Sequence, residues 1–308
     1  MFSGFVLRFA ALVVALLSAG QVLAGSTGPA VSGPNGKISV EGGSYDDEGG
    51  GVALGSFAVP LTHSFGVQFD GAVGTIDDEL LGGGGVHLFT RDPSSYLLGV
   101  YGSYHTWDSI DIWRTAAEAE LYLGRFSLGG LAGYESVDVP TTSGGLLVLT
   151  PDDEHFFGKL NLSYYATENF KLSAGYRYES EISLGTASAE YLITGYETPV
   201  SVFARGDFGE DDYNSVSGGL KIYFGADPRK SLIQRHRTED PDNYTPVFPK
   251  LTTQAPQSTT VPATPKPTCP LDTFADPNCI CGSGNPRAGQ PPAQLPEVVP
   301  PRYTCSLP

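Results

Sequence analysis

Cysteine is absent from most of this 308-residue chain, because its four cysteines lie at positions 269, 279, 281 and 305. The bulk of the fold is therefore held without disulfides. After the N-terminus no run of 18 apolar residues occurs, which excludes a transmembrane helix. Basic residues are also scarce: 18 Lys and Arg stand against 34 Asp and Glu, for a net charge of −16. Nucleic acid is excluded as a partner, since phosphate binding needs a basic surface.

The N-terminus has the pattern of a secretory signal peptide over residues 1–24. Arg8 supplies positive charge, Phe9–Leu17 is a short apolar run, and Val22 and Ala24 place small residues before a cut at Gly25. An uncut membrane anchor is the alternative. We expect an exported protein.

Composition divides the rest of the chain into a β domain and a tail. A short segment, 25–35, precedes residues 36–225, which are rich in glycine, tyrosine and phenylalanine. Residues 226–308 hold 17 of the 24 prolines. We interpret 226–268 as a short basic helix and a Pro/Thr-rich linker, and 269–308 as a cysteine-containing tail. Disulfides are favoured there over metal binding, with the pairing open; the candidates are Cys269, Cys279, Cys281 and Cys305.

The β domain contains segments of about ten residues that alternate apolar and polar side chains, the period of a strand. Short connections alternate with acidic ones such as Asp46–Glu48, Asp77–Glu79 and Asp152–Glu154. This order predicts an up-and-down antiparallel barrel with short turns at one end and longer loops at the other. The predicted segments number twelve: 36–45, 52–60, 65–74, 82–91, 96–106, 114–123, 127–135, 155–165, 171–179, 184–192, 200–208 and 215–224.

The two faces of these segments differ as those of a membrane barrel do. One face is aliphatic, with aromatics near segment ends such as Tyr134, Tyr164 and Tyr191, while the other carries charges of both signs. A soluble β fold is the alternative. The charged face is predicted to line a lumen, through Lys37, Glu41, Asp70, Arg114, Glu118, Glu120, Lys159, Arg177, Glu179, Glu190, Arg205, Asp207 and Lys221.

The last predicted strand carries a motif. Ser217, Gly219, Ile222 and Phe224 fit the pattern polar-x-Gly-x-x-apolar-x-apolar. This resembles the β-signal of Gram-negative outer-membrane barrels, and residues 36–225 resemble a porin-like member of that class, although no characterised member matches. The resemblance implies the barrel assembly machinery, outer-membrane lipid and lipopolysaccharide as partners. The motif does not end the chain, which is a departure from many such proteins.

Several functions fit this organisation. The lumen either passes small hydrophilic solutes or is a sealed structural barrel, and the connection 136–154 either constricts it or stands outside. A surface binding or adhesion protein that uses the acidic loops is the second class. A hydrolase is the third: Ser103 and His105 share a face, but that face is lumenal and no nucleophile elbow is present, so we expect no enzyme activity and no cofactor or metal.

If both termini of the barrel domain lie on the periplasmic side, the tail is periplasmic too and contacts the cell wall or a partner.

Overall fold

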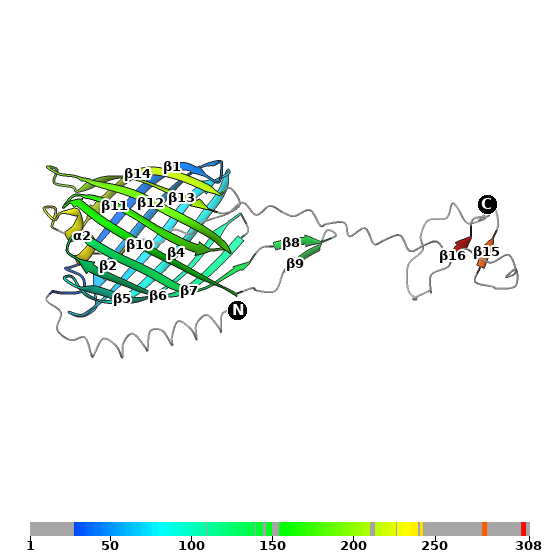
Figure 1. Cartoon of the computed structure of the whole chain (residues 1–308), viewed down its shortest axis with the longest axis horizontal. Coiled ribbons are helices and arrows are strands. Elements are labelled where there is room, and N and C mark those ends of the chain that lie inside the picture. Colours follow the sequence, from blue (N-terminus) through cyan, green and yellow to red (C-terminus); the bar gives the residue numbers. More distant parts are fainter. Residues whose placement is uncertain are drawn as a thin grey trace. The chain divides into compact units, whose positions relative to one another are not determined.

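The computed structural model describes residues 28–108, 110–138, 140–143, 146–149, 154–209, 213–225, 227–239, 241–242, 279–281 and 303–305. The predicted signal peptide lies outside the described residues. Twelve strands form one closed antiparallel barrel (Figure 1). No helix in the described part is long and apolar enough to span a bilayer. The barrel strands are β1 Asn35–Tyr45, β2 Glu48–Pro60, β3 Phe65–Ile76, β4 Glu79–Asp92, β5 Tyr96–Trp107, β6 Ile110–Leu123, β7 Phe126–Asp138, β10 Glu154–Thr167, β11 Phe170–Glu179, β12 Ile182–Ile193, β13 Val200–Gly209 and β14 Asn214–Phe224.

The barrel closes where the last strand pairs with the first. Each strand otherwise pairs with its neighbours along the chain, and β14 pairs antiparallel with β1. Val40 lies opposite Leu220 and Ile38 lies opposite Ile222. Because no strand is left with an unpaired edge, the backbone polar groups of the wall are satisfied without water, as lipid requires. The prediction of a twelve-stranded antiparallel barrel is confirmed.

Among the described residues, four shorter strands are not part of the barrel sheet. β8 (Pro140–Ser143) and β9 (Leu146–Leu149) form a hairpin within the long connection between β7 and β10. The sequence did not predict this hairpin. In a separate unit, Leu251–Pro308, β15 (Cys279–Cys281) pairs in parallel with β16 (Tyr303–Cys305), which places Cys281 opposite Cys305 in the register.

The acidic connections correct one expectation. Several are two-residue turns, not the longer loops that the sequence suggested, for example Asp46–Asp47 between β1 and β2 and Asp77–Asp78 between β3 and β4. Both residues of each turn have positive φ, between 52° and 67° for these four aspartates. Asp tolerates this left-handed region, and two such residues match the twist of a hairpin. We call the end where β1 meets β2 the acidic end. The opposite end, where β2 meets β3, keeps the name of its sequence-based prediction, the short-turn end, although its connections reach six residues between β12 and β13.

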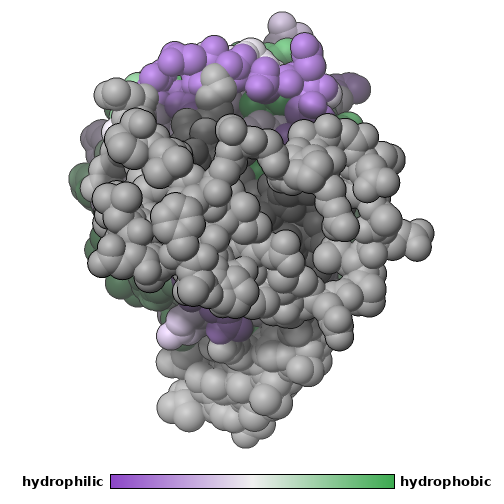
Figure 2. Space-filling model, turned by 90° about the vertical axis from the view of Figure 1, so that its right-hand side faces the viewer, coloured by the Kyte–Doolittle hydropathy of each residue, from purple (hydrophilic) through white to green (hydrophobic). Residues whose placement is uncertain are grey.

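The outer wall is apolar between aromatic groups at the two ends. Phe126 contacts Tyr164 near the short-turn end, with ring centroids 4.9 Å apart, and Tyr104 contacts Trp113 near the acidic end at 4.4 Å. In Figure 2, the coloured atoms show hydrophilic residues at the rim and hydrophobic residues on the wall behind it. This pattern is typical of a membrane barrel with its aromatic girdles. Exposed aliphatic residues of the wall include Ile38, Val40, Val73, Leu123, Leu160, Leu162, Leu172, Val202, Val216, Leu220 and Ile222.

The inner wall has two dissimilar halves. On β1–β6, near the acidic end, an apolar cluster includes Tyr45, Ile76, Trp107 and Ile112, all at most 8% exposed. The facing strands β11–β14 carry small polar side chains inward instead, such as Ser173. One half of the lumen is therefore packed like a protein core, and the other half is polar.

Two adjacent glycines of β1 provide a test of the pairing between β1 and β14. A Cβ atom on Gly43 would collide with the Val216 carbonyl oxygen and lie 2.6 Å from Ser217 Cα, whereas one on Gly42 would meet nothing closer than 3.5 Å. We expect Gly43→Ala to destabilise the barrel by about 1–3 kcal/mol and Gly42→Ala to be nearly neutral. The measurement is the thermal midpoint of heat-modifiable gel mobility in detergent. Equal midpoints for the two variants would contradict this β1–β14 register.

Candidate functional site

The charged residues of the inner wall form ion-pair networks. His87 lies between two of the predicted lumen carboxylates, with Nε2 3.0 Å from Asp70 Oδ2 and Nδ1 2.8 Å from Glu118 Oε2. The His87 side chain is almost fully buried. These contacts join β3, β4 and β6 on the packed side of the lumen.

A second network crosses the acidic half of the barrel. Arg114 Nη2 lies 2.7 Å from Glu135 Oε2 and 3.4 Å from Glu179 Oε2. Glu179 also pairs with Arg177, whose Nη1 lies 3.5 Å from Asp207 Oδ2. Arg114, Glu135 and Glu179 are at most 1% exposed. Removing one partner of a buried pair typically costs about 3–5 kcal/mol, because it leaves an uncompensated charge. The network therefore fixes β6, β7, β11 and β13 relative to one another.

Glu190 on β12 is the centre of a third network, near the short-turn end. Lys221 Nζ lies 3.0 Å from Glu190 Oε2, and Lys171 Nζ lies 3.9 Å from the same atom. The Tyr223 hydroxyl donates to Glu190 Oε1 at 2.6 Å, and the Ser201 hydroxyl donates to it at 2.7 Å. Side chains from three strands, β11, β13 and β14, thus converge on the Glu190 carboxylate of β12.

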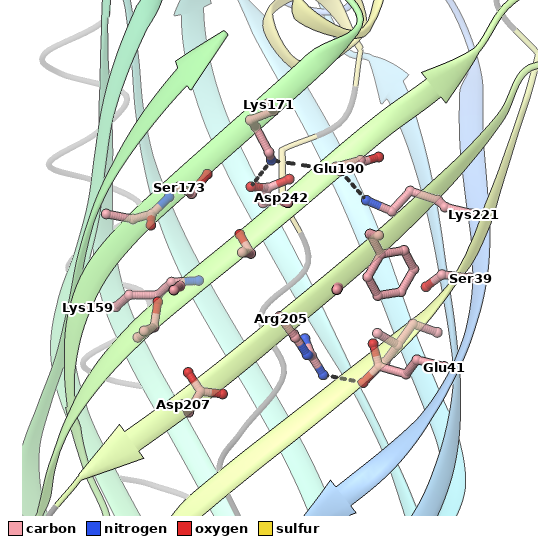
Figure 3. A pocket seen from close by; sticks show the side chains of 18 of the residues that line it. Ser39, Glu41, Lys159, Lys171, Ser173, Glu190, Arg205, Asp207, Lys221 and Asp242 are labelled. Carbon is pink, nitrogen blue, oxygen red and sulfur yellow. Dashed lines mark hydrogen bonds and ion pairs between the residues drawn. The ribbon is translucent and has the colours of Figure 1, made fainter. Parts of the chain in front are cut away.

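The second and third networks border a cavity of about 130 Å³ in the polar half of the lumen (Figure 3). Figure 3 shows Lys159, Lys171, Arg205, Asp207 and Lys221 around it, with Arg205 paired to Glu41. Of the thirteen residues predicted to line a lumen, the cavity contacts Glu41, Lys159, Arg177, Glu190, Arg205, Asp207 and Lys221. Of the other six, Lys37 lies near the short-turn end and Glu120 accepts a hydrogen bond from Tyr122. The last four belong to the first two networks: Asp70, Glu118, Arg114 and Glu179.

The closing-strand residues are divided between the two faces. Ser217 is 3% exposed on the inner face, where its hydroxyl accepts a hydrogen bond from Arg205 Nε. Ile222 and Phe224 are on the outer face, 44% and 42% exposed. A Cβ on Gly219 would collide with the Val40 carbonyl oxygen. The close approach of β1 therefore favours glycine at position 219, in addition to its predicted place in an assembly signal.

Two segments that flank the barrel in sequence close its short-turn end. We call them together the plug: residues 28–34, and residues 227–239 with 241–242, which include helix α2 (Leu232–Thr238). Leu232 is fully buried in a cluster with Tyr165, Leu192 and Tyr223 from the wall. The guanidinium of Arg237 lies 5.0 Å from the centre of the Tyr122 ring. The sequence predicted a short helix here, but not its docking.

The two parts of the plug are joined by Arg91. Its Nη1 donates to the Glu239 carbonyl oxygen at 2.6 Å and to the Ala30 carbonyl oxygen at 3.2 Å. A backbone bond from Ser32 N to Thr238 O, 2.8 Å long, joins the same segments. Arg91 is fully buried and lies on the inner face of β4.

Beyond α2 the chain enters the lumen. The Pro241 carbonyl oxygen accepts hydrogen bonds from Lys37 Nζ at 2.8 Å and Gln68 Nε2 at 3.3 Å. Asp242 Oδ2 lies 3.4 Å from Lys171 Nζ, and its side chain is half exposed to the cavity that it helps to line. The nearby Lys171 ammonium holds the pKa of Asp242 well below its usual range. Sequence reasoning missed both residues, since nothing in their composition distinguishes them from a linker.

His236 of α2 is held neutral by burial, which lowers its pKa to about 3. The Tyr165 hydroxyl lies 2.9 Å from its Nδ1. Its Nε2 lies 3.8 Å from Glu190 Oε2, but at neutral pH this approach is not an ion pair because the imidazole is uncharged.

The residues considered for hydrolysis are inside the barrel. Ser103 and His105 on β5 are 4% and 3% exposed, and both point away from the lipid-facing wall. Among the residues that the structure describes, no group of three or more His, Cys, Asp or Glu side chains is placed to hold a metal ion. For Cys279, Cys281 and Cys305 only the strand register is described, and Cys269 lies outside the described residues.

Comparison with known proteins finds solved barrel structures that are similar at TM-scores below 0.5. No protein-family model matches the chain, and no curated protein does. Similar solved structures include the KdgM porin (9% identity, TM-score 0.45, 61% of this chain and 99% of that chain covered). An outer-membrane channel from Pseudomonas putida F1 is similar over 63% of this chain and 96% of its own (9% identity, TM-score 0.47). The translocator domain of autotransporter NalP from Neisseria meningitidis is similar over 71% and 94% (11% identity, TM-score 0.40). The fold of this chain is established by its own strand pairing.

The pKa of His236 predicts that acid loosens the plug. Docked His236 has a pKa of about 3, and an undocked histidine has one near 6.5, so the undocked state binds more protons between these values. The docking of α2 is most stable above about pH 6.5. The free energy that favours docking decreases as the pH falls, by about 2 kcal/mol at pH 5. Lys171, Lys221, Glu190 and Asp242 surround the imidazole, and Asp242 stays ionised throughout this range.

Hydrogen exchange of the backbone over residues 230–239 measures this effect, after correction for intrinsic rates. We expect faster exchange at pH 5 than at pH 7.5 in the wild type. A His236→Asn variant, which has no imidazole to protonate, should lose this pH dependence. Equal protection of the wild type at both pH values would show that His236 protonation is not linked to docking.

Proposed function

We propose that this chain is a porin-like β-barrel of the Gram-negative outer membrane, exported by the signal peptide 1–24, with a polar lumen that passes small hydrophilic solutes. The observation that carries the proposal is the contrast between the two faces of one closed barrel. The outer face exposes residues such as Leu160 and Val216, at 56% and 52%, while the inner face carries paired charges. Water would favour the opposite arrangement, and lipid favours this one. Outer-membrane lipid, lipopolysaccharide and the barrel assembly machinery are the partners that follow.

The path that supports permeation is the polar half of the lumen. Its cavity has charges of both signs, from Lys159, Arg205, Lys221, Glu190 and Asp207. Mixed charges on a narrow wall favour small hydrophilic solutes over apolar ones. The opposite half is filled by apolar side chains and by the His87 and Arg114 networks, and so offers little room.

The plug limits this permeation. It closes the short-turn end through Leu232, Arg91 and Arg237, and it places Asp242 in the cavity itself. We therefore propose a low conductance for the docked state and a higher one when α2 is displaced.

The competing classes receive less support. A binding protein that uses acidic loops needs loop surface, and Asp46–Asp47, Asp77–Asp78 and Ser180–Glu181 are two-residue turns. Catalysis at Ser103 and His105 needs access to a substrate, and both side chains are buried. We propose that the barrel performs no turnover.

Planar-bilayer conductance of the full-length mature chain tests the proposal. Leu232→Asp places a charge in the buried cluster with Tyr165 and Tyr223, which should displace α2 and raise the single-channel conductance severalfold over the wild type. Arg229→Gln is the matched control, because the Arg229 side chain is 88% exposed outside that cluster. If folded Leu232→Asp protein gives no steps, the barrel is structural and not a channel.

A further inference from the structure

We propose that the polar cavity contains a binding site for a small carboxylate solute, formed around the Lys171 ammonium group, and that the Asp242 side chain of the plug occupies this site as a tethered ligand. Displacement of the plug opens the site to a carboxylate from solution and makes the barrel anion-selective. The inference rests on the proposed permeation function, and it adds the class of solute and the residue that selects it.

The Asp242 side chain contacts the barrel wall in the manner of a bound carboxylate. Its Oδ2 lies 3.4 Å from Lys171 Nζ, and Figure 3 shows the two side chains pointing toward each other. The preceding residue is held as well, because the Pro241 carbonyl oxygen accepts a hydrogen bond from Lys37 Nζ at 2.8 Å. Beyond its Cα, an aspartate side chain is an acetate group. The structure therefore shows how a small carboxylate lies on Lys171.

Three ammonium groups attract this carboxylate from three different strands. Lys171 of β11 is the main cause of the lowered pKa of Asp242, and Lys37 of β1 and Lys221 of β14 add to it. A nearby positive charge favours the ionised form of a carboxyl group. Because the three lysines belong to the closed wall, the attraction remains when the plug leaves, and a carboxylate from solution experiences the same attraction.

Lys171 differs from three other cations of the cavity in having its nearer carboxylate partner on the plug. Its Nζ is 3.4 Å from Asp242 but 3.9 Å from Glu190 of the wall. Its side chain is 7% exposed and that of Asp242 is 48% exposed, so the cation is a fixed part of the wall and the anion is the removable partner. The three other cations pair with wall carboxylates: Lys221 with Glu190, Arg177 with Asp207, and Arg205 with Glu41.

The charge of the cavity lining changes when the plug leaves. The lining contains five Lys and Arg residues and four Asp and Glu residues, and Asp242 is the one acidic residue among them that belongs to the plug. Without Asp242 the wall contributes five positive charges against three negative ones. Charged groups on a narrow wall set the selectivity of a channel, so this excess favours anions.

The surroundings of Lys171 suit a small hydrophilic molecule. Ser173, two residues further along β11, lies opposite Ser188 of β12, and both line the cavity. Ser39 and Asn161 add a hydroxyl and an amide to the lining. These groups can donate to, or accept from, a second polar group of the solute. The cavity volume of about 130 Å³ restricts the solute to a small one.

Ion selectivity in planar bilayers tests the site, with the full-length mature chain and the Leu232→Asp substitution that displaces α2. The reversal potential in a gradient of KCl, and then of potassium acetate, gives the ratio of anion to cation permeability. Leu232→Asp adds a negative charge, so it works against anion selectivity and cannot be its source. Heat-modifiable gel mobility confirms that each variant is folded.

We expect the Leu232→Asp protein to favour the anion in both salts. Adding Lys171→Gln should lower the anion-to-cation permeability ratio severalfold, and Lys171→Arg, which keeps the charge, should retain the ratio. Arg229→Gln is the matched control, because it removes a positive charge from a side chain that is 88% exposed and should leave the ratio unchanged. With α2 docked, Asp242→Asn alone should shift the remaining current toward anions, because it removes the tethered carboxylate.

Three results would overturn the proposal while permeation itself stands. These are single-channel steps with equal anion and cation permeability, a ratio that Lys171→Gln does not change, and selectivity for chloride without selectivity for acetate. Absence of steps from folded Leu232→Asp protein would instead overturn the permeation function together with this site. The two failures are therefore distinguishable in one experiment.

Discussion

The pairing of β14 with β1 is the constraint on which the rest of the structure depends. In lipid, every backbone N–H and C=O of a sheet needs a partner within the protein, so an open edge is not tolerated. Val40 opposite Leu220 and Ile38 opposite Ile222 close the edge and set the register of the wall. Because side chains alternate along every strand, this register also decides which residues meet lipid and which meet the lumen.

The interior of the barrel is narrow, and its two halves are filled by different kinds of side chain. On one side, apolar residues such as Trp107 and the buried His87 and Arg114 networks fill the space. On the other side, serines and the ion pairs of Glu190 leave a polar cavity. The cavity, and not the barrel as a whole, is the part that can admit a solute or a chain segment. The plug occupies its entrance, with Asp242 placed where an anionic solute would otherwise meet Lys171.

Much of the wall was predictable from sequence, since a period of two gives both the strands and their faces. Ile222 outward and Lys221 inward follow from alternation alone, and Glu41 and Arg205, which alternation assigns to one face, form an ion pair in the structure. Turn geometry was not predictable in the same way. Asp46 and Asp47 indicate a polar connection, but only their positive φ values show that it is two residues long.

The contacts of the plug were beyond sequence reasoning for a physical reason. Alternation assigns side chains within a strand, but says nothing about which other segment fills the space that the strands enclose. His236, Pro241 and Asp242 have no periodicity that points to Tyr165, Lys37 or Lys171. Long-range contacts of this kind depend on the shape of the barrel mouth, which exists only once the strands have closed.

Carbodiimide coupling in membranes tests most directly whether the chain enters its own barrel. The reagent joins an amine to a carboxylate only where the two are already in contact. Peptide mass spectrometry should find an amide between Lys171 and Asp242, whose charged atoms lie 3.4 Å apart, alongside one between Lys221 and Glu190, 3.0 Å apart in the wall. Coupling of Lys221 to Glu190 without coupling of Lys171 to Asp242 would contradict the account, since it would show an intact barrel whose lumen does not hold the segment after α2.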